Sequence, residues 1–154
     1  MTTISSAVGK AFAEKFVTQF AAGFKENNHA VTMRGLLADK ISWDWSDDTK
    51  GSGTPADIIG IFAKSWGAMV DSFNLPTMQV VVDTTHAKVI FTGPLIINIT
   101  GGMADETNLV HNPICMILTL NDKMQVTHWE GYWDQTDANM QNALGKVMAR
   151  MKAA

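Results

Sequence analysis

The sequence predicts an α+β protein in which helices gather on one face of an antiparallel sheet. Two observations predict this class. Apolar residues recur at helical spacing over about the first 75 positions and again near the C-terminus, whereas the stretch from 77 to 134 alternates with period two. The resulting order is helix, helix, strand, helix, four strands and helix, which separates most strands from the helices instead of alternating them.

The first helix is marked by an apolar residue at every fourth position from 4 to 24. Each four-residue step advances about 40° beyond a full turn, so the stripe winds around the helix. This pattern predicts a long helix that is surrounded by other structure. We expect Thr2 or Thr3 to cap its start and Asn27-Asn28 to end it or to begin a second, shorter helix over 31–37.

A short strand and a third helix follow. The strand is predicted because three apolar residues alternate with polar ones. They are Ile41, Trp43 and Trp45. The segment 47–53 (DDTKGSG) is expected to be a solvated loop. Thr54-Pro55 is typical of a helix start, and the apolar face of this helix is expected to extend over 58–73.

Four strands and a closing helix complete the chain. The strands are expected at about 77–83, 86–100, 107–120 and 123–134. Asp83-Thr84-Thr85, Gly101-Gly102 and Asn121-Asp122 mark the turns between them. Asp134 is expected to cap the last helix, although it could instead act as a catalytic group.

Composition bounds the function. A chain of 154 residues is expected to form one domain, 1–154. A net charge of −3 with only two arginines argues against a nucleic-acid surface. The single cysteine, Cys115, lies in an apolar run, which favours a core residue and a reducing compartment. We find neither a secretory leader nor an 18-residue apolar run, so a cytoplasmic protein without membrane contact is expected.

Three stretches of the chain resemble the nuclear-transport-factor-2-like (NTF2-like) superfamily and, within it, the SnoaL-like branch. They are NNHAVTMRGLLADKISWDW, GTPADIIGIFAKSW and NDKMQVTHWEGYWDQTDANMQNALG. The resemblance implies a cone-shaped fold, in which a bent sheet wraps around N-terminal helices and encloses an apolar pocket. It also implies a hydrophobic small-molecule ligand and a homodimer formed through the open sheet face.

The resemblance does not select one chemistry, because enzymes and non-catalytic binding modules share this fold. The steroid isomerase branch uses a tyrosine of the first helix, but the only tyrosine here is Tyr132. The epoxide hydrolase branch needs an arginine between two aspartates, and Arg34 has no obvious carboxylate pair. The polyketide cyclase branch needs little beyond one acid/base group in an apolar pocket and is the least excluded.

The segment HWEGYWD, 128–134, contains the densest set of candidate catalytic residues. Alternation places its polar residues on one face of the strand and its tryptophans on the other. If the polar face lined the pocket, His128 and Glu130 could transfer a proton, with Asp44 as an alternative acid, and Tyr132 could donate to an oxyanion. If that face were the outer one, the same residues would face solvent or a second subunit, and the tryptophans would fill the cone.

Six further residues are candidates for ligand binding on the wall of an apolar pocket. They are Trp43, Trp45, Trp66, Met33, Phe62 and His111. Aromatic rings would stack on a flat ligand and methionines would adapt to its shape, although ordinary core packing explains the same pattern. Asp44 points away from Trp43 and Trp45, so both sets line one pocket only if a bulge intervenes.

The remaining signals predict no cofactor. Neither a metal-ligand spacing nor a glycine-rich nucleotide loop is found, so we expect no metal and no nucleotide. His29, at a helix start, is expected on the surface. The sequence therefore predicts a small-molecule-binding protein, either a cofactor-free lyase, isomerase or cyclase or a non-catalytic binding or assembly module.

Overall fold

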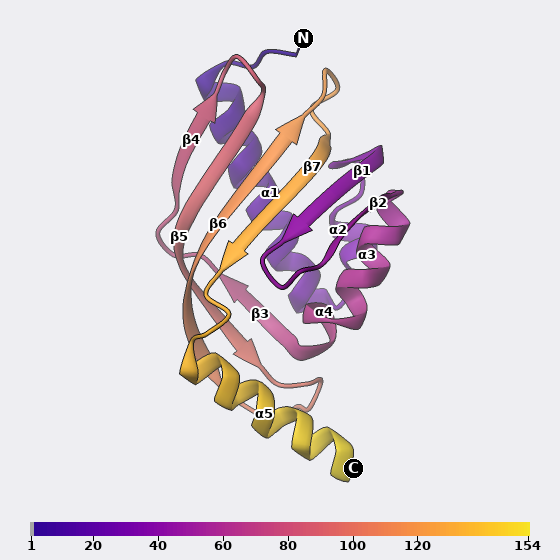
Figure 1. Cartoon of the computed structure of the whole chain (residues 1–154), viewed down its shortest axis with the longest axis vertical. Coiled ribbons are helices and arrows are strands. Elements are labelled where there is room, and N and C mark those ends of the chain that lie inside the picture. The colour runs from indigo at the N-terminus through magenta and orange to yellow at the C-terminus, as the bar shows by residue number, and fades with distance from the viewer. Residues whose placement is uncertain (1) are drawn as a thin grey trace.

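The computed structural model describes residues 2–154. A curved seven-stranded sheet wraps around the long helix α1, and α5 crosses below the lower end of the sheet (Figure 1). The helices are α1 (Ser6–Glu26), α2 (His29–Thr32), α3 (Pro55–Lys64), α4 (Trp66–Met69) and α5 (Ala138–Ala153). The strands are β1 (Leu37–Trp45), β2 (Lys50–Gly53), β3 (Val70–Asn74), β4 (Gln79–Asp83), β5 (Lys88–Ile99), β6 (Leu109–Leu120) and β7 (Val126–Trp133).

The sheet has the order β2-β1-β7-β6-β5-β3, with β4 paired to β5. All pairs are antiparallel except β1 and β7, which run parallel. A register shift between Leu37 and Ser42 bends β1 against β7. The expected antiparallel sheet is therefore confirmed apart from this one pair, which joins the first strand of the chain to the last.

Helix α1 begins later than its sequence suggests. Ser5 caps it, because the Ser5 hydroxyl accepts a hydrogen bond from the backbone N–H of Val8, whereas Thr2 donates to Asp122. The expected cap at Thr2 or Thr3 is therefore wrong. Asn27 ends the helix in the left-handed conformation, at φ 51°, and satisfies carbonyls of the last turn as predicted.

Two short strands were not expected from the sequence. β2 lies in the segment taken for a loop, where its backbone pairs with β1. β3 lies where the third helix was expected to continue, because Ser65 interrupts the helix and the chain after α4 pairs with the far end of β5. The spacing of apolar residues did not distinguish a helix from a strand at β3, since the burial of Val70 and Phe73 is compatible with either.

The helix start at Thr54 is confirmed. Its hydroxyl accepts from the backbone N–H of Asp57, and the Asp57 carboxylate accepts from the backbone N–H of Thr54. These hydrogen bonds form a capping box and hold the pKa of Asp57 below its usual value. Asp134, in contrast, does not cap α5. That role belongs to Asp137, and Asp134 accepts from Thr136 in the preceding turn.

The core lies between α1 and the concave face of the sheet. Phe16 and Trp129 are 1% and 2% exposed, and their rings meet edge to face with centroids 5.2 Å apart. Phe20 contacts Trp129 in the same way at 5.3 Å. The winding stripe of α1 is thus explained, because sheet and helices surround this helix on several sides.

The strand β7 has its tryptophans inside. Trp129 and Gly131 are buried under α1 and β1, whereas Glu130 is half-buried and Tyr132 exposed on the convex face. The curvature of the sheet therefore decides between the two arrangements that the sequence left open. The polar face of HWEGYWD is the outer one.

Candidate functional site

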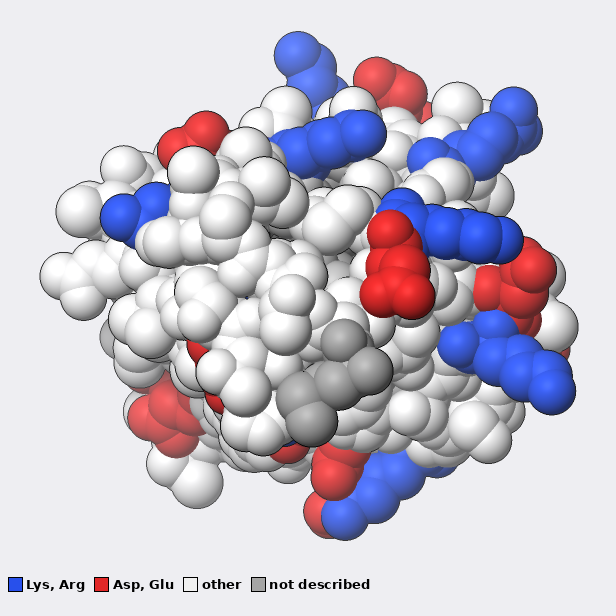
Figure 2. Space-filling model, turned by 90° about the horizontal axis from the view of Figure 1, so that it is seen from above, with Lys and Arg blue, Asp and Glu red and all other residues white. Residues whose placement is uncertain are grey.

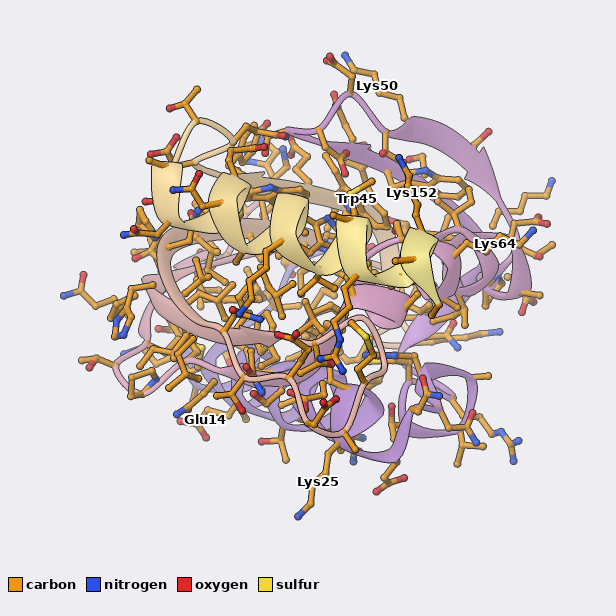
Figure 3. All side chains as sticks on the ribbon, turned by 90° about the horizontal axis from the view of Figure 1, so that it is seen from below. Glu14, Lys25, Trp45, Lys50, Lys64 and Lys152 are labelled. Carbon is orange, nitrogen blue, oxygen red and sulfur yellow. The ribbon has the colours of Figure 1, made fainter. Side chains whose placement is uncertain are left out.

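An apolar cavity of about 60 Å³ lies between the lower half of α1, the concave face of the sheet and the start of α5. The helices contribute Phe20, Phe24, Phe62, Trp66 and Met140 to its wall. The sheet contributes, among others, Trp45, Trp129, Trp133, Ile97, Ile114 and Met116. Figure 3 looks onto this end of the molecule, with Trp45 behind α5 and with Lys25 and Lys50 pointing outward.

Aromatic contacts fix the shape of the cavity. Trp45 meets Trp129 at 5.4 Å and Phe62 at 6.4 Å between ring centroids, in both cases edge to face. Trp66 and Trp133 form a further edge-to-face pair at 5.7 Å. Because these last two side chains are only partly buried, they mark the side on which the cavity approaches solvent.

The polar atoms of the wall are either used internally or unpaired. Asn112 donates to the carbonyl of Asp134 and accepts from its N–H. The Nε1–H of Trp129 donates to the sulfur of Met116. The Nε1 atoms of Trp45 and Trp133 are buried without a protein partner. Among the described residues, no ionisable side chain lines the cavity.

A buried histidine stands directly behind this wall. His29 is 6% exposed, which corrects the expectation that it lies on the surface. Its ring packs against Phe20, Phe24 and Phe62 with centroids 4.6 to 5.3 Å apart, and Nε2 hydrogen-bonds the carbonyl of Phe20 at 3.0 Å. Burial lowers the pKa of His29 to about 4, so the ring is neutral at pH 7.

The predicted ligand-binding residues divide into two groups. Three of them lie on the cavity wall, namely Trp45, Trp66 and Phe62. The other three do not line the cavity. Trp43 packs over the edge strand at Gly51, Met33 is buried at the end of α2, and His111 is exposed on the convex face of β6. These three residues therefore lie away from the cavity, because of their positions along the chain or the face of the strand on which they lie.

The predicted catalytic residues lie together, but on the convex face of the sheet. The Ser42 Oγ and His128 Nδ1 atoms share a hydrogen bond of 2.6 Å, and Tyr132 donates to Glu130 at 2.9 Å. This last hydrogen bond raises the pKa of Tyr132. Asp44 forms a 3.6 Å ion pair with Lys50. The sheet therefore separates all four predicted catalytic residues from the cavity.

Several wall residues were not singled out from the sequence as ligand-binding positions. Phe20 and Phe24 belong to the winding stripe of α1, and Trp129 and Trp133 to the non-polar face of HWEGYWD. Both sequence patterns indicated that these side chains are buried. They did not indicate which buried side chains leave a space between them.

The charged side chains form no broad patch of one sign on the face shown in Figure 2, where blue and red are interspersed. Among the described residues, no group of three or more His, Cys, Asp or Glu side chains is placed to hold a metal ion. No helix in the same part of the chain is long and apolar enough to cross a membrane.

Fold and cavity together define a cone-shaped α+β protein with an apolar interior space. The sequence matches no protein-family model, and no curated protein matches it either. Solved structures do match, and they show that the chain has the NTF2-like fold, in the form found in SnoaL-like proteins.

Three of these structures illustrate the likeness. An NTF2-like protein from Anabaena variabilis has 11% identity and a TM-score of 0.65, with 88% of this chain and 96% of that chain covered. A provisionally assigned SnoaL-like polyketide cyclase from Shewanella denitrificans has 16% identity and a TM-score of 0.62, with 90% and 98% covered. A provisionally assigned isomerase from Bacillus subtilis has 12% identity and a TM-score of 0.65, with 89% and 95% covered. At such identities the likeness concerns the fold alone.

Proposed function

We propose that this protein binds a small apolar molecule, or the apolar part of a larger one, in the cavity. The chemistry of the wall supports the proposal, because aromatic and aliphatic side chains surround the space and offer no charge. An engineered cavity of about 150 Å³ lined by similar residues stays dry and binds benzene. The present space of about 60 Å³ is smaller, so a ring-sized ligand requires Trp66 or Trp133 to move.

The wall favours binding over acid–base catalysis in the cavity. A general acid or base has to come within hydrogen-bond reach of the proton that it transfers. His29 is a titratable group close to the cavity, but it stands behind Phe20, Phe24 and Phe62 with its Nε2 bonded to a backbone carbonyl. A substrate in the cavity would therefore meet rings rather than an ionisable group.

Benzene is a suitable probe, because four tryptophans on the wall give a fluorescence signal when the space is occupied. We expect saturable changes in tryptophan emission and an increase in Tm with benzene concentration. Ile114→Phe, which fills the cavity, should weaken this binding at least about tenfold. Ile117→Phe is the matched control, since it places the same ring on the convex face of the same strand.

Native mass spectrometry of the purified protein provides an independent test. A co-purifying apolar compound that is lost in Ile114→Phe and retained in Ile117→Phe supports the proposal and identifies the ligand. If benzene neither saturates nor shifts Tm, and no compound co-purifies, the cavity is a packing defect and the proposal is wrong.

We also propose that the convex face pairs with a second copy of the chain. The outer patch, defined as Val81, Ile90, Ile96 and Leu109 on β4, β5 and β6, supports this. Val81 and Leu109 are 62% and 63% exposed, and large apolar side chains exposed on one face of a sheet are typical of interaction sites. Light scattering after size-exclusion chromatography tests this pairing. We expect the wild type to be a dimer and Ile96→Glu to be a folded monomer. A monomeric wild type would contradict the pairing.

A further inference from the structure

A short serine–histidine hydrogen bond lies on the convex face, between β1 and β7. Ser42 of β1 and His128 of β7 are direct neighbours in the parallel pair. The Ser42 Oγ and His128 Nδ1 atoms are 2.6 Å apart, within the reach required between a nucleophile and its general base. Ser42 has a weaker alternative partner in the carbonyl of Thr127, at 3.5 Å.

An open groove of about 450 Å³ begins at this serine. Polar side chains stand in its walls among a larger share of apolar surface, whereas the cavity wall offers almost no polar surface. The walls of the groove include Asp39, Lys40, Ser42, Ser52, Thr54 and Thr127. The groove follows from the register shift in β1, because the bend between Leu37 and Ser42 moves that strand away from an even pairing with β7. A small molecule can therefore approach Ser42 from solvent.

We propose that Ser42 and His128 form an acyl-transfer site for small esters held in this groove. The Ser42 Oγ attacks the ester carbonyl, and its proton passes to His128 Nδ1. The carbon–oxygen bond to the alcohol breaks, and the leaving alkoxide takes that proton from His128. Water, deprotonated by the same nitrogen, then cleaves the acyl-serine to a carboxylic acid and restores Ser42.

Two carboxylates lie near this pair on the same face of the sheet. Asp44 follows Ser42 and Glu130 follows His128 by two positions on the same face, about 6.6 Å along each strand. No hydrogen bond to His128 Nε2 is formed within the described residues, so the site is a dyad and not a triad.

The Ser42–His128 hydrogen bond could serve only to join β1 to β7. The test therefore has to separate the reactivity of Ser42 from the stability of the protein. The full-length protein is treated with a fluorophosphonate, and the modified residues are quantified over time by peptide mass spectrometry. Ser52 is the internal reference, because it lines the same groove and forms no hydrogen bond to a histidine in the described structure. We expect Ser42 to react about 100-fold faster than Ser52, as is typical of general-base assistance.

His128→Gln distinguishes the two roles, because glutamine offers an acceptor to Ser42 but cannot take up the proton. This variant should react at the Ser52 rate while keeping the Tm of the wild type within a few degrees. If the variant is unstable, Ser42→Ala replaces it: hydrolysis of p-nitrophenyl acetate should then fall to the rate of the buffer and surface groups.

Three results would overturn the proposal. Ser42 could react no faster than Ser52, its rate could be unchanged in His128→Gln, or Ser42→Ala could leave ester hydrolysis intact. The cavity-filling Ile114→Phe variant should leave Ser42 labelling unchanged, since Ile114 lies on the opposite face of the sheet. The acyl-transfer site and the apolar cavity can therefore fail or succeed independently.

Discussion

Acidification should destabilise this protein through His29 before its carboxylates become protonated. The His29 ring is buried against three phenylalanines, and Gly23 of α1 leaves room for it, since a Cβ there would collide with the imidazole. Burial disfavours the charged ring and lowers its pKa from 6.5 to about 4. Between these two values the unfolded chain binds a proton that the folded chain does not, so stability decreases as the pH falls through this window.

The magnitude follows from the two pKa values. A difference from 6.5 to about 4 corresponds to at most about 3 kcal/mol in the free energy of unfolding. The contribution is fully present above about pH 7 and lost once the pH is below about 4. Domains of this size unfold with about 5–15 kcal/mol, so the loss is a substantial fraction of the total.

The comparison is made between wild type and His29→Phe by urea unfolding at about pH 7.5, 6.5, 5.5, 4.5 and 3.5. Phenylalanine keeps the ring contacts and removes the titration, at a cost of about 1 kcal/mol for the lost hydrogen bond to Phe20. The other three histidines and all carboxylates are common to both proteins, so their contributions cancel in the difference. We expect this difference to shift by about 3 kcal/mol in favour of His29→Phe between pH 7.5 and pH 3.5.

Parallel stability curves over the whole pH range would refute the reasoning, because they would mean that His29 titrates as it does in the unfolded chain. An NMR titration of the His29 Cε1–H resonance checks the cause directly. Its midpoint should lie near pH 4 and not near 6.5.

Two further predictions concern helix contacts. Gly23→Ala should destabilise the protein by about 1–3 kcal/mol in thermal unfolding, because the new methyl group displaces His29 and this outweighs the better helix propensity of alanine. Gly145→Ala is the control: a Cβ there meets open space, so this variant should stabilise the protein by about 1 kcal/mol. Equal effects of the two substitutions would contradict the clash with His29. Arg150→Gln should lower Tm, because Arg150 binds Glu106 at 2.6 Å and holds the pKa of Glu106 below the usual range. The difference in Tm between wild type and variant should shrink below about pH 4 as Glu106 is protonated. A difference in Tm that does not change with pH would contradict the ion pair.

The sequence was sufficient for the elements whose signals are local. The stripe of α1, the capping box at Thr54 and the alternation of β5, β6 and β7 each depend on residues a few positions apart. β2 and β3 were missed because their pairing partners lie elsewhere in the chain and their own residues carry no strand pattern. The parallel pairing of β1 with β7 likewise joins segments some 86 positions apart, which no local pattern records.

The same distinction between local patterns and tertiary contacts applies to the candidate sites. By itself, the sequence determined that HWEGYWD has a polar and an aromatic face, because successive side chains of a strand point to opposite sides. Only the tertiary structure decided that the aromatic face is concave, since the direction in which a sheet curls depends on what packs against it. That curvature places Trp129 and Trp133 on the cavity wall and brings His128 to Ser42 on the convex face.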